Sequence, residues 1–196
     1  MMKILSFDTT LSTDVQWLQQ LQQNDAQALA SLMEKYYQDL YNYAAKFTRD
    51  EGLIKDCIQD IFISLWQRRQ TALTILSPRY YLLRAVKNKV LKALYRNDQK
   101  GYPFDLPDEY DFFQEFSIER ILIEKQITED KAEKLKRALS QLSKRQQEVI
   151  YLKFYQYLDQ GQIAEQMDIS RQSVYNLLHE AIQKIRSIWI AEPIPR

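Results

Sequence analysis

The chain has 196 residues, of which 45% are hydrophobic, so it could form one large domain or two small ones with buried cores. Its three glycines and five prolines are too few for a turn-rich all-β fold, and the helix formers Gln, Leu, Lys, Glu and Ala are abundant, so we expect an all-α protein. The formal net charge of +1 leaves nucleic-acid binding open, because only the distribution of charge can decide it.

Cysteine and histidine each occur once, as Cys57 and His179. A single cysteine excludes an internal disulfide, and the pair is too few for a typical zinc site, so we expect no metal and no cofactor. The first ten residues lack the apolar stretch of a signal peptide, and no run of about 18 apolar residues is present. We therefore expect a cytoplasmic protein that does not insert into a membrane.

Residues 14–96 form the first predicted helical domain. Apolar residues from Trp17 to Phe47 recur mostly at intervals of three and four, and Asn24 or Asp25 can cap a helix that starts there. The stretch "LIKDCIQDIFISLWQRR" continues the pattern, with one broad apolar face and a polar face on the other side. Ser77 and Pro78 then begin a further helix, because proline is well tolerated in a first helical turn.

The helix that follows, "SPRYYLLRAVKNKVLKALYR", is strongly basic. From Arg79 to Lys100 there are seven Lys or Arg residues against one Asp, a local charge of +6, with Tyr80, Tyr81 and Tyr95 among them. Basic groups neutralise phosphates and aromatic rings stack on unpaired bases, so this helix is a candidate surface for single-stranded or melting DNA. The alternative is a solvated basic face whose tyrosines belong to the core.

Residues 97–119 change in character. They contain a glycine, two prolines and six carboxylates between Asp105 and Glu119, and we interpret them as an acidic linker. A packed irregular loop is the alternative, because the segment also carries four phenylalanines, at 104, 112, 113 and 116.

Residues 120–190 form the second predicted helical domain. "SKRQ" at 143–146 has the form of a capping box, and the helix it starts should direct Val149, Ile150, Leu152 and Phe154 inward. Asp159 and Gln162 mark the start of a short helix, about 160–166, with Ile163 inward. Asp168 then suits a tight corner, and Ser170 caps the last helix.

The last helix has two faces. The face expected to be buried carries Val174, Leu177, Leu178, Ala181, Ile182 and Ile185. The opposite face begins with the hydrogen-bonding residues Arg171, Gln172, Ser173, Tyr175, Asn176 and His179. Such residues in the first half of a helix suit the recognition helix of a helix-turn-helix, which reads base edges in the major groove. The alternative is the solvated face of an ordinary helical hairpin.

In this order the motifs resemble a bacterial RNA polymerase sigma factor of the extracytoplasmic-function (ECF) group. "DCIQDIFISLWQRR" is similar to region 2.2, "YYLLRAVKNKVLKALYR" to regions 2.3 and 2.4, and "LSKRQQEVIYLKFYQYLDQGQIAEQMDISRQSVYNLLHEAIQKIR" to region 4. With the preceding helices, the resemblance covers about Asp14 to Arg186. It implies two small helical domains joined by a linker, and a transcription initiation factor rather than an enzyme.

The resemblance also implies partners and site residues. The partners are core RNA polymerase, through its β′ clamp and β flap, promoter DNA, and an anti-sigma factor. The residues implied in polymerase binding are Asp56, Gln59, Asp60, Phe62 and Trp66. Those implied at the −10 element are Tyr80, Arg84, Asn88, Lys89, Lys92, Tyr95 and Arg96, with Asn88 capturing an extruded base. Those implied at the −35 element are Arg171, Gln172, Ser173, Tyr175, Asn176 and His179. The linker would thread near the active-site channel, where its carboxylates could mimic nucleic-acid charge.

Two departures and two alternatives accompany this resemblance. The corner of the helix-turn-helix often carries glycine where this chain has Asp168, and the tail "SIWIAEPIPR" extends past the usual end. A helix-turn-helix regulator with a helical dimerisation or sensor domain would use the last helices identically, without needing the basic helix. A helical enzyme would rest on Glu34, Asp56 and Asp60 as carboxylate ligands, but it lacks a Glu-x-x-His pair.

Overall fold

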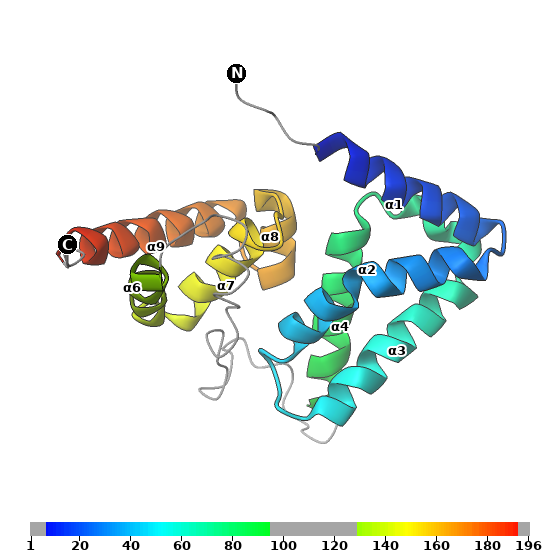
Figure 1. The fold of residues 1–196 in the computed structure, drawn as a ribbon, viewed down its shortest axis with the longest axis horizontal. Coiled ribbons are helices and arrows are strands. Elements are labelled where there is room, and N and C mark those ends of the chain that lie inside the picture. Colours follow the sequence, from blue (N-terminus) through cyan, green and yellow to red (C-terminus); the bar gives the residue numbers. More distant parts are fainter. Residues whose placement is uncertain (1–6, 95–128, 192–196) are drawn as a thin grey trace. The chain divides into compact units, whose positions relative to one another are not determined.

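The computed structural model describes residues 7–94 and 129–191, and every regular element in these ranges is a helix (Figure 1). The all-α prediction is confirmed. The chain divides into two compact units, Met1–Pro103 and Phe104–Arg196, each described separately below. The predicted linker at 97–119 lies outside the described residues, so the division at 14–96, 97–119 and 120–190 stays a prediction.

The first unit consists of α1 (Phe7–Gln22), α2 (Ala26–Ala44), α3 (Glu51–Gln67), the short 3₁₀ helix η1 (Arg69–Thr74) and α4 (Pro78–Leu94). The second helix, α2, packs against α1, α3 and α4, while α3 also packs against α4 and η1 packs against α1. The first helix begins before Asp14, where the sequence pattern placed the start of the domain. Large side chains fully buried in this unit are Leu18, Leu21, Leu32, Leu40, Tyr43, Ile54, Ile58, Leu82 and Leu83.

Local chemistry sets the starts of these helices. Asn24 takes a left-handed φ of 68°, and Asp25 caps α2 by accepting a hydrogen bond from the amide of Gln27 at 2.8 Å. Of the two residues predicted to cap this helix, Asp25 is therefore the one that does so. Asp50 caps α3 in the same manner, through the amide of Leu53 at 3.0 Å. The fourth helix begins at Pro78, as predicted.

Charged side chains inside the first unit connect α2 to the start of α4 and to α1. Arg79 lies 2.9 Å from the carboxylate of Asp39 on α2, and its guanidinium lies over the ring of Tyr36. The Tyr36 hydroxyl donates to Asp14 on α1 at 2.6 Å, and Lys35 binds the other oxygen of that carboxylate. Each buried carboxylate thus has a cationic partner, as burial of a charge requires.

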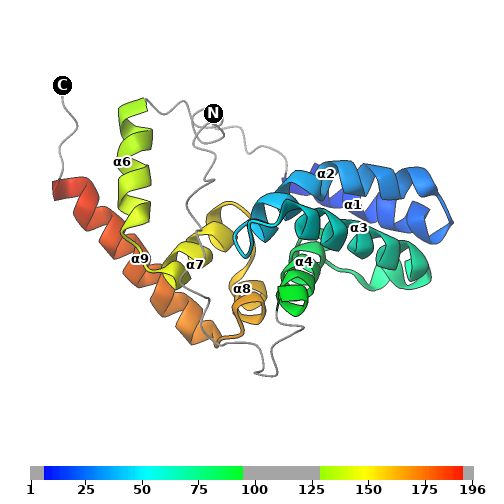
Figure 2. The same ribbon diagram turned by 90° about the horizontal axis from the view of Figure 1, so that it is seen from below.

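The second unit consists of α6 (Glu129–Ser140), α7 (Lys144–Phe154), α8 (Gln160–Met167) and α9 (Arg171–Ala191). The three shorter helices each pack against α9, and they follow it in the order α6, α7, α8 (Figure 2). The predicted capping box of Ser143 with Gln146 is present, and the predicted helix start at Asp159 and Gln162 is a capping box as well. Asp168 forms the corner with a left-handed φ of 52°, and Ser170 accepts from the amide of Ser173 to cap α9.

Two residues expected to face inward are exposed. Phe154 is 51% exposed because it is the last residue of α7, and the chain turns away there. Ile182 is 40% exposed because the buried face of α9 is centred on Val174, Leu178 and Ala181, and Ile182 lies at its edge.

Candidate nucleic-acid interface

The polar face of α3 is open to solvent. Asp56, Gln59 and Asp60 are exposed, whereas Trp66 is half-buried and stacks against the guanidinium of Arg69. Phe62 is only 3% exposed and belongs to the core of the first unit. The five residues expected to bind a partner therefore differ in position. Three form an exposed surface and Trp66 lies at its end. Phe62 packs in the core beneath the helix and does not face solvent.

The cations of α4 differ in what they contact. Arg79 is engaged by Asp39, as described above. Arg84 donates to the hydroxyl of Tyr80 at 2.8 Å, and the ammonium of Lys87 lies over the ring of Phe47. Lys89 forms an ion pair with Asp60 of α3 at 3.0 Å. The high positive charge of this helix is thus partly compensated by its neighbours.

Among the predicted residues on α4, Asn88 and Lys92 are exposed and suited to an external ligand. Asn88 presents an amide that can pair with a base edge, and Lys92 presents an ammonium one turn further along. Arg84 is exposed too, while Tyr80 and Lys89 are half-buried. The structure therefore brings these five predicted residues onto one helix. Tyr95 and Arg96, also predicted here, lie outside the described residues.

The first half of α9 presents a polar surface built from pairs. Gln172 donates to Asn176 at 3.0 Å, and the rings of Tyr175 and His179 stack with centroids 6.3 Å apart. Ser173 is half-buried by its contact with Ser170, and the other predicted residues of this face are exposed. Pairing at intervals of four favours one direction for each of these four side chains before a ligand binds.

Arg171 lies at the start of this surface and reaches back to α8. A Cβ built on Gly161 would stand 3.1 Å from a guanidinium nitrogen of Arg171 and 3.1 Å from Oδ1 of Asp159, the cap of α8. The absence of a side chain at Gly161 therefore leaves room for the guanidinium beside the first turn of α8.

Two observations on the described residues concern metal binding and cysteine reactivity. No group of three or more His, Cys, Asp or Glu residues among them could hold a metal ion, so Glu34, Asp56 and Asp60 do not form the carboxylate set considered above. Burial raises the pKa of the Cys57 thiol, which lowers its reactivity. Within the same ranges, no helix combines the length and apolarity needed to span a membrane.

Sequence reasoning missed two features of these surfaces. One is the Lys89–Asp60 ion pair, which joins two helices that were assigned to different ligands. The other is Leu76, which follows η1 and is 92% exposed immediately before α4. The apolar residues of "ALTIL" at 72–76, which are Ala72, Leu73, Ile75 and Leu76, were the available signal for the latter.

Comparisons with known proteins match both units. The family model Sigma-70 region 2 matches residues 32–100, and the model Sigma-70, region 4 matches residues 132–185, so that together they span more than half of the chain. The ECF RNA polymerase sigma factor SigL of Mycobacterium tuberculosis (strain H37Rv) is 28% identical over 176 residues, which cover 82% of this chain and 90% of the relative. The same figures hold for SigL of the Erdman strain.

A solved structure shares the fold. The structure of CnrH in complex with the cytosolic domain of CnrY superposes with a TM-score of 0.51 at 20% sequence identity, covering 92% of this chain and 99% of that chain. At this identity the likeness supports the fold alone.

Proposed function

The chain belongs to the sigma-70 family, in its ECF group, and from this premise we propose how its surfaces divide the work of starting transcription. As a sigma factor it binds core RNA polymerase and directs promoter recognition. Members of the family are initiation factors rather than enzymes. A helix-turn-helix regulator would share only the region 4 part, whereas this chain also matches region 2 across its basic helix.

The polar face of α3 is the proposed polymerase-docking surface, which we define as Asp56, Gln59 and Asp60 together with Trp66 at its end. In this proposal it contacts the coiled coil of the β′ clamp, and region 4 contacts the β flap. The exposure of its three polar residues supports this assignment. Phe62 contributes indirectly, because its buried ring holds the helix that presents them.

The basic helix α4 is proposed to bind the −10 element. Extruding a base costs a few kcal/mol, which contacts in the binding pocket must offset. Asn88 is the proposed base reader because its amide is exposed and can donate and accept along one base edge. Lys92, Lys89 and Arg84 would neutralise phosphates, and the ring of Tyr80 would stack. Tyr95 and Arg96 are proposed to extend the same surface.

The start of α9 is proposed to read the −35 element. Arg171 and the paired Gln172 and Asn176 have the donors and acceptors that base edges in the major groove require. Tyr175 and His179 lie about one to two turns further along the helix and are suited to the sugar–phosphate backbone. Ser173 is proposed to contact a phosphate beside the helix N-terminus.

A protein partner is also proposed. The solved CnrH structure contains the cytosolic domain of a second protein, CnrY. By likeness, we propose that an anti-sigma factor binds this chain and covers its polymerase-docking surface. Binding to polymerase and promoter DNA would place the protein in the cytoplasm.

Run-off transcription tests the proposal. Purified protein is mixed with sigma-free core polymerase and sheared DNA of the source genome, and transcript starts are mapped. We expect discrete new starts that share two spaced upstream motifs.

On such a promoter, Asn88→Ala should reduce transcription and Arg171→Ala should relax selection of the −35 motif, each by about tenfold or more. Asn42→Ala, which removes a half-buried amide from α2, outside the proposed DNA surfaces, is the control. No specific start, with no co-elution with core, would contradict the proposal.

A further inference from the structure

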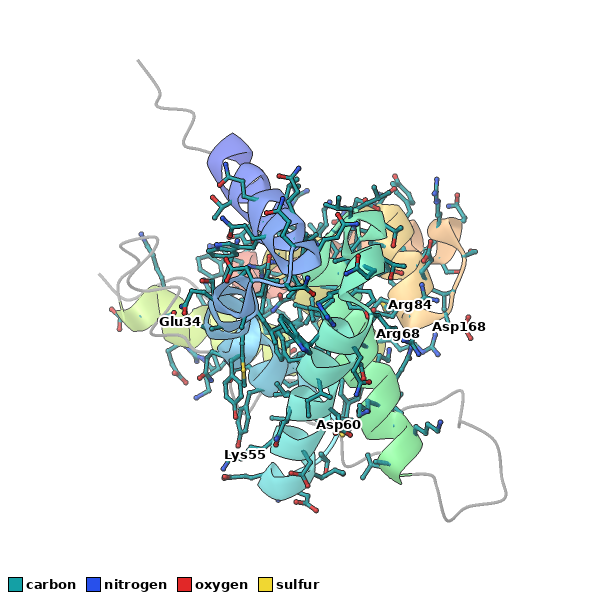
Figure 3. All side chains as sticks on the ribbon, turned by 90° about the vertical axis from the view of Figure 1, so that its right-hand side faces the viewer. Glu34, Lys55, Asp60, Arg68, Arg84 and Asp168 are labelled. Carbon is teal, nitrogen blue, oxygen red and sulfur yellow. The ribbon has the colours of Figure 1, made fainter. Side chains whose placement is uncertain are left out.

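The two surfaces assigned to polymerase and to the −10 element touch each other in the free protein. Asp60 belongs to the polymerase-docking surface on α3, and Lys89 belongs to the proposed DNA surface on α4. Their Oδ2 and Nζ atoms are 3.0 Å apart, and the side chains are 58% and 35% exposed, respectively. Figure 3 shows Asp60 on the side of α3 that lies toward α4.

The pair is distinct from the other ion pair of α3. Lys55 binds Glu51 one turn away on the same helix, at 3.2 Å, and Figure 3 places Lys55 on the other side of α3 from α4. That contact links nothing beyond its own helix. The Asp60–Lys89 pair, in contrast, connects a carboxylate that a protein partner would use with an ammonium that a phosphate would use.

Lys89 competes with the polymerase for Asp60, and Asp60 competes with DNA phosphate for Lys89. While Lys89 holds Asp60, the carboxylate is partly neutralised and less available to donors on the polymerase. While Asp60 holds Lys89, its negative charge lies where a phosphate would bind. Because both side chains are partly exposed, the pair is weak enough for either ligand to break it.

We propose that the Asp60–Lys89 ion pair couples polymerase docking to −10 binding, with Lys89 opposing docking until Asp60 is engaged. The proposal rests on the function proposed above for α3 and α4. Docking takes Asp60 from Lys89 and leaves the ammonium available for phosphate. By thermodynamic reciprocity, DNA that takes Lys89 strengthens docking by the same factor.

The test measures core affinity and promoter opening on the full chain. Fluorescently labelled protein is titrated with sigma-free core polymerase, and opening is followed with permanganate on the promoter found by run-off transcription. Lys89→Gln should tighten core binding about two- to fivefold, the effect of losing one exposed competing pair, and should weaken opening. Lys92→Gln, which removes an exposed ammonium from the same helix, should weaken opening alone. Lys89→Arg keeps the charge and should leave core affinity near wild type.

Asp60→Asn distinguishes a failure of the proposed coupling from a failure of the proposed polymerase-docking surface. It should weaken core binding, and Lys89→Gln should no longer tighten binding when it is added to this variant. If Asp60→Asn weakens binding but Lys89→Gln alone does not tighten it, the coupling is wrong and the docking surface stands. If Asp60→Asn leaves core affinity unchanged, both proposals fail. Thermal melts of each variant exclude an effect of misfolding, because an exposed pair contributes little to stability.

Discussion

The side chain of Arg79 shows why a basic helix is not uniformly a DNA surface. It lies in the first turn of α4, but its guanidinium is bound to Asp39 and stacked over Tyr36, and it is 27% exposed. The side chain of Asp39 is only 12% exposed, so the ion pair with Arg79 stabilises its charge. Lys92, on the same helix, is exposed to solvent. Two cations that are equivalent in the sequence therefore have different roles.

This difference predicts that substituting Arg79 changes stability, whereas substituting Lys92 changes DNA binding. Arg79→Gln should lower the free energy of unfolding by about 1–3 kcal/mol, because it removes a cation that is bound to a largely buried carboxylate. Lys92→Gln should change stability by less than about 0.5 kcal/mol and should reduce the salt dependence of promoter binding by about one unit of slope. Urea unfolding measures the change in stability, and promoter binding at several salt concentrations measures the change in salt dependence. Equal stability effects would contradict the assignment.

Tyr36 makes a second prediction, about alkaline pH. Burial, and then its hydrogen bond to Asp14, hold the pKa of Tyr36 well above its ordinary value. The unfolded chain loses this proton at about pH 10 and the folded chain keeps it, so the contribution of Tyr36 to stability is present below that pH and is lost as the pH rises above it. The midpoint of urea unfolding should thus fall less steeply between pH 9 and about 11 in Tyr36→Phe than in the wild type.

A control is needed for that measurement because the Cys57 thiol also has a raised pKa and acts in the same direction. Cys57→Ala in both backgrounds removes its contribution. Parallel pH profiles for the tyrosine and phenylalanine forms would show that Tyr36 is not the titrating group. At neutral pH, Tyr36→Phe should cost about 1 kcal/mol through the lost hydrogen bond.

At the scale of elements, the starts of helices could be predicted and their long-range contacts could not. Asp25, Ser143 and Asp159 cap helices through groups two or three residues away, so the chemistry is visible in a short stretch of sequence. The pairing of Arg79 with Asp39 spans 40 residues and depends on how α4 crosses α2. The polar residues of the candidate sites were predicted from their types and spacing, but which cations are already paired follows only from packing.

Residues 187–191, at the start of the tail for which the sequence suggested no role, extend α9 and hold α6 against it. Lys134 of α6 is 3% exposed, and its ammonium donates to the carbonyl of Trp189 at 2.6 Å while lying over the indole ring. That carbonyl is in the last turn of α9, where carbonyls lack partners within the helix and a cation is favourable.

Truncation after Arg186 should therefore destabilise the second unit by about 1–3 kcal/mol, through lost packing and a lost cap. Truncation after Ala191 keeps both partners of the contact and is the matched control. Thermal unfolding followed by circular dichroism measures the difference. If both truncated forms melt at the same temperature, Lys134 does not depend on the tail.

At the scale of the molecule, the net charge of +1 conceals surfaces of different character. The first unit presents an acidic and polar face on α3 and a basic face on α4, and the second unit presents the uncharged and basic residues of α9. Each unit also has its own buried residues, from Leu18 to Val90 in one and from Ala132 to Ala181 in the other. The proposed binding of a protein and of two separate DNA elements requires this separation of surfaces.

Separate cores predict that the units fold independently. Fragments 1–103 and 104–196 are each long enough to bury a core of their own, so both should unfold cooperatively in urea. The first fragment should co-elute with core polymerase and lose this property with Asp60→Asn. The second should bind a duplex carrying the −35 motif, weakly and with strong salt dependence, because it has lost the contacts of the first unit. A fragment that fails to fold alone, while the intact chain folds, would show that its core depends on residues from the other unit.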